Sequence, residues 1–204
     1  YSVYKNGVSY ASGLGPYPPG GSAYPITGLA GATSYNIHVT AWNSSWESSG
    51  SPVTAMLTRP AKMSISALQP SDVTRTSAVL RWSMTNGNKP ASVTAKSSDL
   101  LTTYSSTTDI NAGTTTITGL DTATVYSVKL IGTNATGDSV PSDAMSVTLK
   151  CAIPAAPTVS NITASGCRIS WSAVANATGY AVYKDNVFQG TTTNLYYDAS
   201  GLTS

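Results

Sequence analysis

The sequence predicts an all-β chain of tandem antiparallel β-sandwiches, with about 90 residues per module. Apolar and polar residues alternate with a period of two, as in "YNIHVTAW" at 35–42 and "YSVKLIG" at 126–132. No stretch shows the sustained i, i+3, i+4, i+7 apolar spacing of an amphipathic helix. The words "YSVYKNGV" at 1–8 and "YAVYKDNV" at 180–187 begin 179 residues apart, which points to an internal repeat.

The predicted strands are short and are bounded by Gly, Ser, Asn and Pro. "SAVLRWS" at 77–83 and "CRISWSA" at 167–173 add to the two strands above. Within 35–42 the alternation places Tyr35, Ile37 and Val39 on the inner face and His38 and Trp42 on the solvent face. Many short strands with regular turns favour a sandwich.

The period of the repeat follows from two further pairs of segments. Trp82 in "VLRWS" and Trp171 in "RISWS" lie 89 residues apart. Leu29 in "GLAGATSYNIHV" and Leu120 in "GLDTATVYSVKL" lie 91 apart. The 179-residue spacing is therefore two periods, and the chain holds parts of three units.

These residues give the unit a resemblance to the fibronectin type III module, a seven-stranded sandwich of two sheets. The resemblance implies a buried Trp on the second strand, here Trp82 and Trp171. It also implies a tyrosine corner on the sixth strand, here Tyr35 and Tyr126, whose hydroxyl bonds to upstream backbone. The third strand of the family often reads Tyr-x-Val-Tyr, which matches 1–4 and 180–183. The middle unit departs from this pattern, because "ASVTAKSSD" at 91–99 lacks these tyrosines.

The resemblance predicts three modules. Residues 1–59 form a partial module that lacks the first two strands, 60–150 a complete module, and 151–204 a partial module that lacks the last two strands. Half a sandwich leaves an apolar face wet, so we expect a longer parent chain in preference to completion by neighbouring copies. "SWSAVANATGYAVYKDN" at 170–186 is similar to modules of large secreted bacterial proteins.

Composition argues against several classes of function. Charged residues make up 10% of the chain and the net charge is +2, with the basic residues scattered, so we expect no nucleic-acid partner. Ser and Thr supply about three residues in ten, which predicts a hydroxyl-rich surface. No apolar run reaches the roughly 20 residues of a membrane helix. With His38 expected in solvent, Glu47 in a loop and the aspartates mostly at turns, we predict no enzyme, no metal site and no cofactor.

The cysteines and the Asn-x-Ser/Thr motifs leave alternatives open. Cys151 is predicted about a dozen residues along the first strand from the position opposite Cys167, which is far for an internal disulfide. Pairing with a cysteine outside this segment or on a neighbouring chain, or a buried free thiol at Cys167, are the alternatives. The loop 133–142 carries Thr136, Gly137 and Asp138 where the family can carry Arg-Gly-Asp, and we expect an ordinary hairpin tip. Four glycosylation motifs occur about as often as composition alone predicts, with the first two as the best candidates: Asn43, Asn134, Asn161 and Asn176.

Aromatic residues are the most unusual feature of the first module. The predicted loop 9–25 carries Tyr10, Tyr17 and Tyr24, and "AWNSSWE" at 41–47 carries Trp42 and Trp46. The positions that match the two tryptophans in the middle module are Thr133 and Gly137, so the fold does not require them. We expect them to pack on a preceding module or a neighbouring chain, or to form a carbohydrate-stacking surface.

The sequence therefore predicts a non-enzymatic extracellular structural array, a stalk or filament in which modules supply spacing and cohesion. Its expected partners are neighbouring modules or copies of the same chain. Two alternatives remain: a spacer region of a secreted carbohydrate-active enzyme, and a glycan-binding adhesin. Fold alone cannot decide among them, because one fold hosts many functions.

Overall fold

The computed structural model describes residues 1–15, 23–84 and 89–202, and within them the chain is all-β. Its strands form antiparallel sheets, and the described residues hold one short 3-10 helix, η1 (Pro70–Asp72). The chain divides into two compact units. Unit 1 comprises 1–67, 81–115 and 128–145, and unit 2 comprises 68–80, 116–127 and 146–204.

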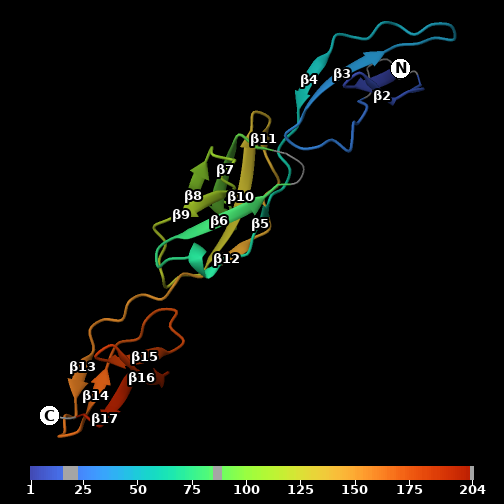
Figure 1. The fold of residues 1–204 in the computed structure, drawn as a ribbon. Coiled ribbons are helices and arrows are strands. Elements are labelled where there is room, and N and C mark those ends of the chain that lie inside the picture. Colours follow the sequence, from blue (N-terminus) through green and yellow to red (C-terminus); the bar gives the residue numbers. More distant parts are fainter. Residues whose placement is uncertain (16–22, 85–88, 203–204) are drawn as a thin grey trace. The chain divides into compact units, whose positions relative to one another are not determined.

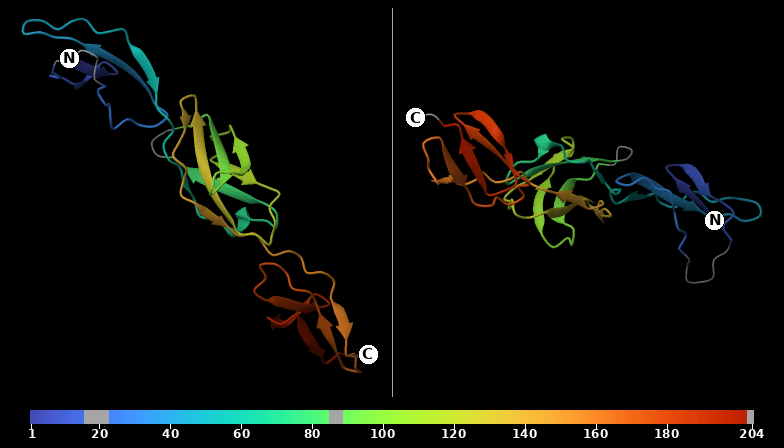
Figure 2. Two further views of the ribbon diagram at one scale, coloured as in Figure 1. Left: turned by 180° about the vertical axis from the view of Figure 1, so that it is seen from behind. Right: turned by 90° about the horizontal axis from the view of Figure 1, so that it is seen from below.

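The first sheet of unit 1 has the order β2-β1-β3-β4. Its strands are β1 (Ser2–Lys5), β2 (Val8–Ala11), β3 (Ser34–Thr40) and β4 (Thr54–Leu57). The long connection between β3 and β4 extends past the ends of its neighbouring strands (Figures 1 and 2). Strand β2 covers 8–11, so the loop predicted from residue 9 starts later, because Ser9 and Ala11 pair with β1.

Two sheets occupy residues 64–147, one in front of the other in Figure 1. The sheet β5-β6-β9 contains β5 (Ser64–Ile65), β6 (Ala78–Ser83) and β9 (Thr114–Ile117). The other has the order β11-β10-β7-β8, and β12 also pairs with β10. Its strands are β7 (Ser92–Ser97), β8 (Thr103–Thr107), β10 (Tyr126–Asn134), β11 (Gly137–Asp138) and β12 (Met145–Val147).

Alternation decides which side chains of these strands are buried. Alternate residues are buried on three of these strands: Ala78, Leu80 and Trp82 on β6, Val93 and Ala95 on β7, and Val128 and Leu130 on β10, where Ile131 is buried as well. Strand neighbours point to opposite faces of a sheet, so this period of two is what a sandwich interior requires. The alternation in 126–132 predicted the burial of Val128 and Leu130, and the resemblance predicted that of Trp82, whereas the burial of Val93 and Ala95 was not predicted.

The strands of residues 158–200 lie in unit 2 and form two groups. The sheet β13-β14-β17 contains β13 (Thr158–Ser160), β14 (Gly166–Ser170) and β17 (Tyr196–Ser200). Strands β15 (Tyr180–Lys184) and β16 (Val187–Thr192) form a two-stranded hairpin. Arg168 on β14 and Asp198 on β17 are cross-strand partners and share two hydrogen bonds of 2.7 Å each.

The similar segments at 1–8 and 180–187 each fold into a hairpin of the same type. Each has a two-residue turn with positive φ at both positions, namely Asn6 (51°) and Gly7 (77°), and Asp185 (49°) and Asn186 (64°). This is the backbone of a type I′ turn, whose twist matches that of the flanking strands. Each hairpin also has a register shift at the same place, between the Val and the second Tyr of the repeated word.

Numbering the strands of one module from one to seven makes the repeat visible in the topology. Residues 64–147 show the orders 1-2-5 and 4-3-6-7. Residues 1–59 show 4-3-6-7, and residues 151–204 show 1-2-5 and the pair 3-4. Among the described residues between β2 and β3 no strand occupies the fifth position. The module boundaries at 59/60 and 150/151 stay a prediction.

Two of the four predicted core markers are buried. Trp82 is 7% exposed and Tyr35 is 9% exposed. The prediction was wrong in degree for Trp171 and Tyr126, which are half-buried. The Trp171 indole borders an open cavity of about 220 Å³ beside Tyr180, which it meets edge-on at 5.4 Å.

Both tyrosine corners are present. The Tyr35 hydroxyl accepts the backbone N–H of Ala30 at 2.9 Å, and the Tyr126 hydroxyl accepts that of Asp121 at 2.7 Å. The donating N–H lies five residues upstream of the tyrosine in each case. This confirms the role that the resemblance implied for these two tyrosines.

Candidate functional site: the β3–β4 hairpin

The hairpin between β3 and β4 is held by hydrogen bonds that serine side chains supply. Ser51 donates its N–H to the Val39 carbonyl at 2.8 Å, and its Oγ accepts the Val39 N–H at 3.1 Å. Ser48 repeats the arrangement with Ala41, at 2.7 and 2.9 Å. The ribbon is thereby fixed well beyond the last ladder pair of β3 and β4.

The tip of the hairpin is closed by Asn43. Its Oδ1 accepts the N–H groups of Ser45 and Trp46, each at 2.9 Å, and its own N–H donates to the Trp46 carbonyl at 3.0 Å. Trp42 and Glu47 form a bridge across the ribbon just before this turn. The Asn side chain thus replaces backbone partners at the turn, as Asx turns do.

One face of this sheet collects polar and aromatic groups. Antiparallel register places Tyr4 opposite His38, and Ser2 opposite Thr40. The Tyr4 and His38 rings stack in parallel, 4.8 Å apart with 4° between their planes. Cross-strand partners share a face, so Glu47 joins the same face through its bridge with Trp42.

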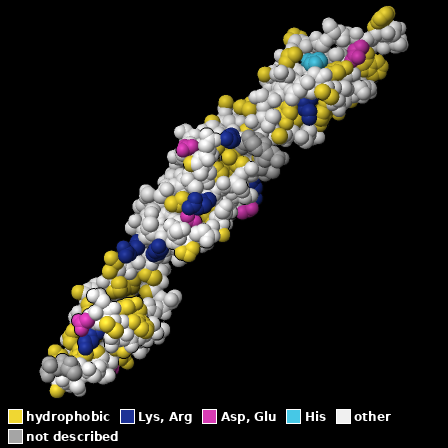
Figure 3. Space-filling view, viewed as in Figure 1, with side chains coloured by type: hydrophobic (Ala, Val, Ile, Leu, Met, Phe, Trp, Pro, Cys, Tyr) yellow, Lys and Arg dark blue, Asp and Glu magenta, His cyan; other side chains and the backbone are white. Residues whose placement is uncertain are grey.

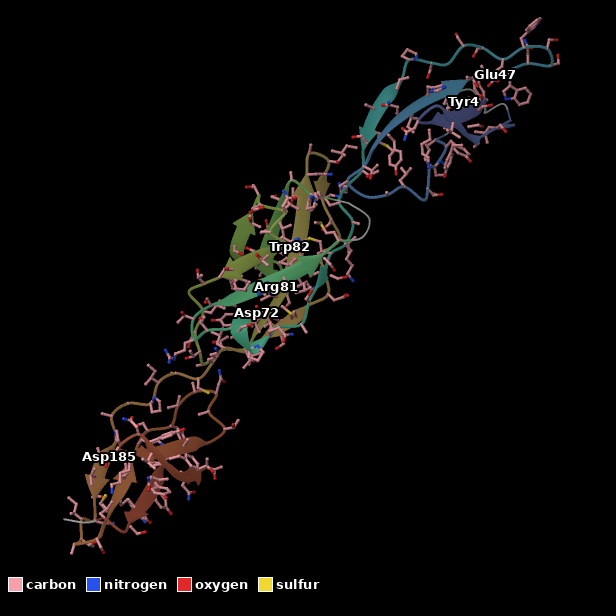
Figure 4. All side chains as sticks on the ribbon, viewed as in Figure 1. Tyr4, Glu47, Asp72, Arg81, Trp82 and Asp185 are labelled. Atoms are coloured by element: carbon pink, nitrogen blue, oxygen red, sulfur yellow. The ribbon has the colours of Figure 1, made fainter. Side chains whose placement is uncertain are left out.

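The Glu47 carboxylate is the polar centre of this face. The Tyr4 hydroxyl donates to Glu47 Oε1 at 3.2 Å, and Thr40 Oγ1 donates to the same oxygen. The Thr40 bond is the main cause that lowers the pKa of Glu47, with the Tyr4 and Ser2 hydroxyls adding to it. The carboxylate in turn raises the pKa of Tyr4. Figure 4 shows Tyr4 and Glu47 next to each other.

Two exposed indoles flank this carboxylate. Trp42 is 49% exposed and Trp46 is 80% exposed. Both border a shallow cavity of about 350 Å³ at the tip of the hairpin, together with Asn43, Glu47 and Ser48. The arrangement offers flat apolar rings beside a charged acceptor, which suits a ligand with both apolar and hydroxyl surfaces.

Sequence analysis found the tryptophans of this site and missed its polar part. His38 was predicted in solvent, but it is half-buried because it stacks on Tyr4. Glu47 was assigned to a loop without a role. The sequence signal that could have indicated this face is strand alternation, which puts His38, Thr40 and Trp42 on one side of the strand. Tyr4 joins them only through the register of β1 against β3.

The predicted tyrosines of the loop 9–25 have different outcomes. Tyr10 lies on β2 and is half-buried, and its part in an interaction stays a prediction. Its hydroxyl accepts the Thr27 N–H at 2.9 Å, and the Thr27 bonds lower the pKa of Tyr10. Tyr24 is partly exposed. Tyr17 lies outside the described residues.

The two cysteines are free thiols and form no disulfide. Cys151 is exposed and its Sγ lies 3.1 Å from the Asn176 carbonyl, whereas Cys167 is half-buried on β14 opposite Ala199. An internal disulfide is therefore absent, and pairing of Cys151 with a cysteine elsewhere stays a prediction.

The four Asn-x-Ser/Thr motifs differ in how their amides are used. Asn134 is a poorer glycosylation candidate than predicted, because its Nδ2, the atom that would carry a glycan, donates to the Thr58 carbonyl at 2.8 Å. The Nδ2 of Asn176 donates to the Thr122 carbonyl. Asn43 and Asn161 are exposed, Asn43 at the hairpin tip and Asn161 in the turn between β13 and β14.

The loop 133–142 is a hairpin. Strands β10 and β11 pair through Thr133 and Asp138, whose side chains also share a 2.6 Å hydrogen bond. A side chain added at Gly137 would meet the Arg59 guanidinium at 3.3 Å, so this turn is covered.

Charged groups are sparse over the visible surface in Figure 3. Within 1–15, 23–84 and 89–202, no group of three or more His, Cys, Asp or Glu is arranged to hold a metal ion. In the same ranges no helix has the length and apolarity to cross a membrane.

No protein-family model matches the sequence, and no curated protein matches it significantly. Solved structures do match. The chicken CNTN1 FN1–FN3 domains share 16% identity over 86% of this chain and 67% of that one, with a TM-score of 0.35. The central fibronectin-III array of RIM-binding protein shares 20% over 68% of this chain and 53% of that one (TM-score 0.34).

A two-domain fibronectin type III segment of chicken tenascin shares 19% identity over 68% of this chain and 83% of that one, with a TM-score of 0.37. These are likenesses to solved structures at low identity. The strand orders 1-2-5 and 4-3-6-7, together with the two tyrosine corners, are the features of this chain itself that make its modules fibronectin type III-like.

Proposed function

We propose that this chain is a non-enzymatic structural array outside the cell, in which sandwich modules joined by short connectors build a stalk or filament. The observation that carries the proposal is that both strand orders of the middle module recur in a neighbouring segment, 4-3-6-7 in residues 1–59 and 1-2-5 in residues 151–204. Repeated modules that contact mainly their neighbours form quasi-one-dimensional assemblies.

The connector at 58–62 supports a role in spacing, because it is short and several of its polar groups are hydrogen-bonded to the adjoining modules. Thr58 Oγ1 donates to the Ala30 carbonyl at 2.6 Å, and the Arg59 carbonyl accepts the Ala32 N–H at 2.9 Å. The Lys62 ammonium pairs with Asp143 at 2.6 Å. A connector with these bonds and Pro60 has less freedom than a Gly/Ser linker.

The low charge of the chain suits an extracellular setting, where the salt concentration varies. Charged residues are 10% of the chain, so contacts between copies would depend little on salt. The enzyme-spacer alternative stays open, since it concerns residues outside this chain.

Small-angle X-ray scattering of the 204-residue chain tests the spacing role. A compact globule of this length has a radius of gyration of about 17 Å. We expect a clearly larger value that is the same at low and high salt. A radius near the compact value would refute an array built on spacing.

A matched variant tests whether the connector sets the spacing. Replacing 58–62 by an equal length of Gly and Ser should broaden the distribution of intramolecular distances without changing the secondary structure. An unchanged distribution would show that the paired connector does not determine the spacing.

A further inference from the structure

The exposed indoles of the β3–β4 hairpin are not explained by folding. Trp46 is 80% exposed, so its ring contributes little to the core, and the middle module has Gly137 at the matching position. An exposed indole beside a second one is costly to keep in water, because large apolar surface favours a partner. The pair therefore calls for a ligand.

The hairpin holds its groups ready before any ligand arrives. Asn43 closes the turn with two bonds from its Oδ1, and Ser48 fixes the ribbon at Ala41. Glu47 is oriented by the hydroxyls of Tyr4 and Thr40. Little conformational entropy would be lost on binding, which is the condition for useful affinity from a small contact area.

The chemistry of the groups selects the ligand class. A sugar ring has one face of C–H groups, which can stack on an indole, and hydroxyls at its edge, which can donate to a carboxylate. Tyr4 and Thr40 donate to Oε1 of Glu47 and Ser2 is a third hydroxyl partner, whereas a carboxylate has about four acceptor positions in all, which leaves room for a ligand hydroxyl. The cavity of about 350 Å³ is within the size range of small-ligand sites.

The charges argue for a neutral sugar. The groups that border the cavity are Ala41, Trp42, Asn43, Trp46, Glu47 and Ser48, and Glu47 is the one ionised side chain among them. An anionic glycan would be repelled by this carboxylate, and a purely apolar partner would leave its remaining acceptor positions unfilled.

We propose that the tip of the β3–β4 hairpin is a binding site for a neutral glycan, with Trp42 and Trp46 as stacking surfaces and Glu47 as the hydroxyl acceptor. This function is additional to the structural role and does not depend on it. It would let the array attach to a polysaccharide surface.

The test uses the full 204-residue chain and the neutral oligosaccharides cellohexaose, xylohexaose, mannohexaose and chitohexaose. We expect at least one of them to shift the indole N–H resonances of Trp42 and Trp46 in a saturable way, with the other tryptophans unchanged. Trp42→Ala and Glu47→Gln should each weaken binding about tenfold or more, as truncation of a central contact does.

Phe188→Ala is the matched control, because it removes an exposed aromatic ring (56% exposed) far along the sequence from the hairpin. It should leave binding unchanged. The proposal is overturned if none of the four sugars shifts the two indoles, or if Phe188→Ala weakens binding as much as Trp42→Ala. It is also overturned if the indole shifts depend only on protein concentration, which would make the tip a contact between copies.

Discussion

Tyr126 is a residue whose hydroxyl, more than its ring, fixes local structure. Its oxygen accepts the Asp121 N–H at 2.7 Å, although the ring is only half-buried. Tyr126→Phe keeps the ring and should lower the free energy of unfolding by about 1 kcal/mol, the usual net value of one hydrogen bond. Urea denaturation measures this loss. Tyr183→Phe, at an exposed hydroxyl, is the control and should cost nothing measurable.

Trp82 combines deep burial with an unpaired donor. Its Nε1 finds no hydrogen-bond partner in the described part of the chain, and the residue is 7% exposed. Trp82→Phe removes the unpaired N–H together with some volume, so it should cost at least 1 kcal/mol less than Trp82→Ala. The alanine variant should lose about 3–5 kcal/mol. Equal losses for both variants in a urea titration would contradict the packing of an aromatic ring at this buried position.

The pKa of Glu47 is lowered in the folded chain, chiefly by the Thr40 hydroxyl, from an ordinary value of 4.5. A lowered pKa stabilises the fold above the unfolded value, and this contribution is lost as pH falls through the folded value. We therefore expect the Tyr4–Glu47 contact to weaken below about pH 4.5. The Tyr4 ring resonances should report the change, and Glu47→Gln should remove it. A Tyr4 titration that persists in Glu47→Gln would assign it to another group.

At the scale of elements, the first and the middle module share a hairpin in which a serine hydrogen-bonds to the opposite strand. Ser142 donates its N–H to the Leu130 carbonyl and accepts the Leu130 N–H, each at 2.9 Å. Ser51 does the same with Val39 in the first module, at the position 91 residues earlier. The serine in each case satisfies two backbone groups where the sixth and seventh strands diverge.

Burial makes these two serines unequal, which gives a matched pair of variants. Leu130 and Ser142 are buried, so Ser142→Ala leaves a donor without water and should cost about 1–3 kcal/mol. Val39 is exposed, so Ser51→Ala should cost less than about 0.5 kcal/mol, because water replaces the hydroxyl. Hydrogen exchange of the Leu130 and Val39 amides checks both. Equal acceleration at the two sites would contradict the role of burial.

At the scale of the whole molecule, the connector after the first module depends on the absence of a side chain at Gly31. A Cβ there would lie 2.5 Å from the Ala61 backbone nitrogen and 2.9 Å from the Arg59 carbonyl oxygen. Backbone atoms cannot swing aside as a flexible side chain can. Gly31 is thus a position where the close approach of two backbone segments requires glycine.

Gly31→Ala should therefore displace the connector and cost about 1–3 kcal/mol, as overpacking does. The amide resonances of Ala32 and Ala61 and a thermal melt measure the effect. Gly15→Ala is the control, because a Cβ at Gly15 would meet nothing within 4 Å. A Gly31→Ala chain with unchanged Ala61 resonance would show that the connector is not packed there in solution.

The sequence by itself determined the periodic features of this protein. Alternation predicted the inner face of 126–132, because successive side chains of a strand point to opposite faces. The spacing of Trp82 and Trp171 predicted a unit of about 90 residues, because equivalent strands recur once per module. The two tyrosine corners were predicted from the resemblance of the Leu-x-x-x-Thr-x-Tyr segments to the sixth strand of the fibronectin type III module. Even the repeated words at 1–8 and 180–187 fold into one kind of hairpin.

Tertiary structure decided what lies beside what. Tyr4, His38 and Glu47 are separated along the chain, and only the register of β1 against β3 and the turn at Asn43 bring them to one face. Local alternation predicted that His38 faces solvent, because the pattern within one strand carries no information about the Tyr4 ring on the neighbouring strand. The hydrogen bonds between Tyr10 and Thr27 and between Asn134 and the connector could not be predicted from local pattern either. Contacts between distant segments depend on register and loop path, and neither is encoded in a local period.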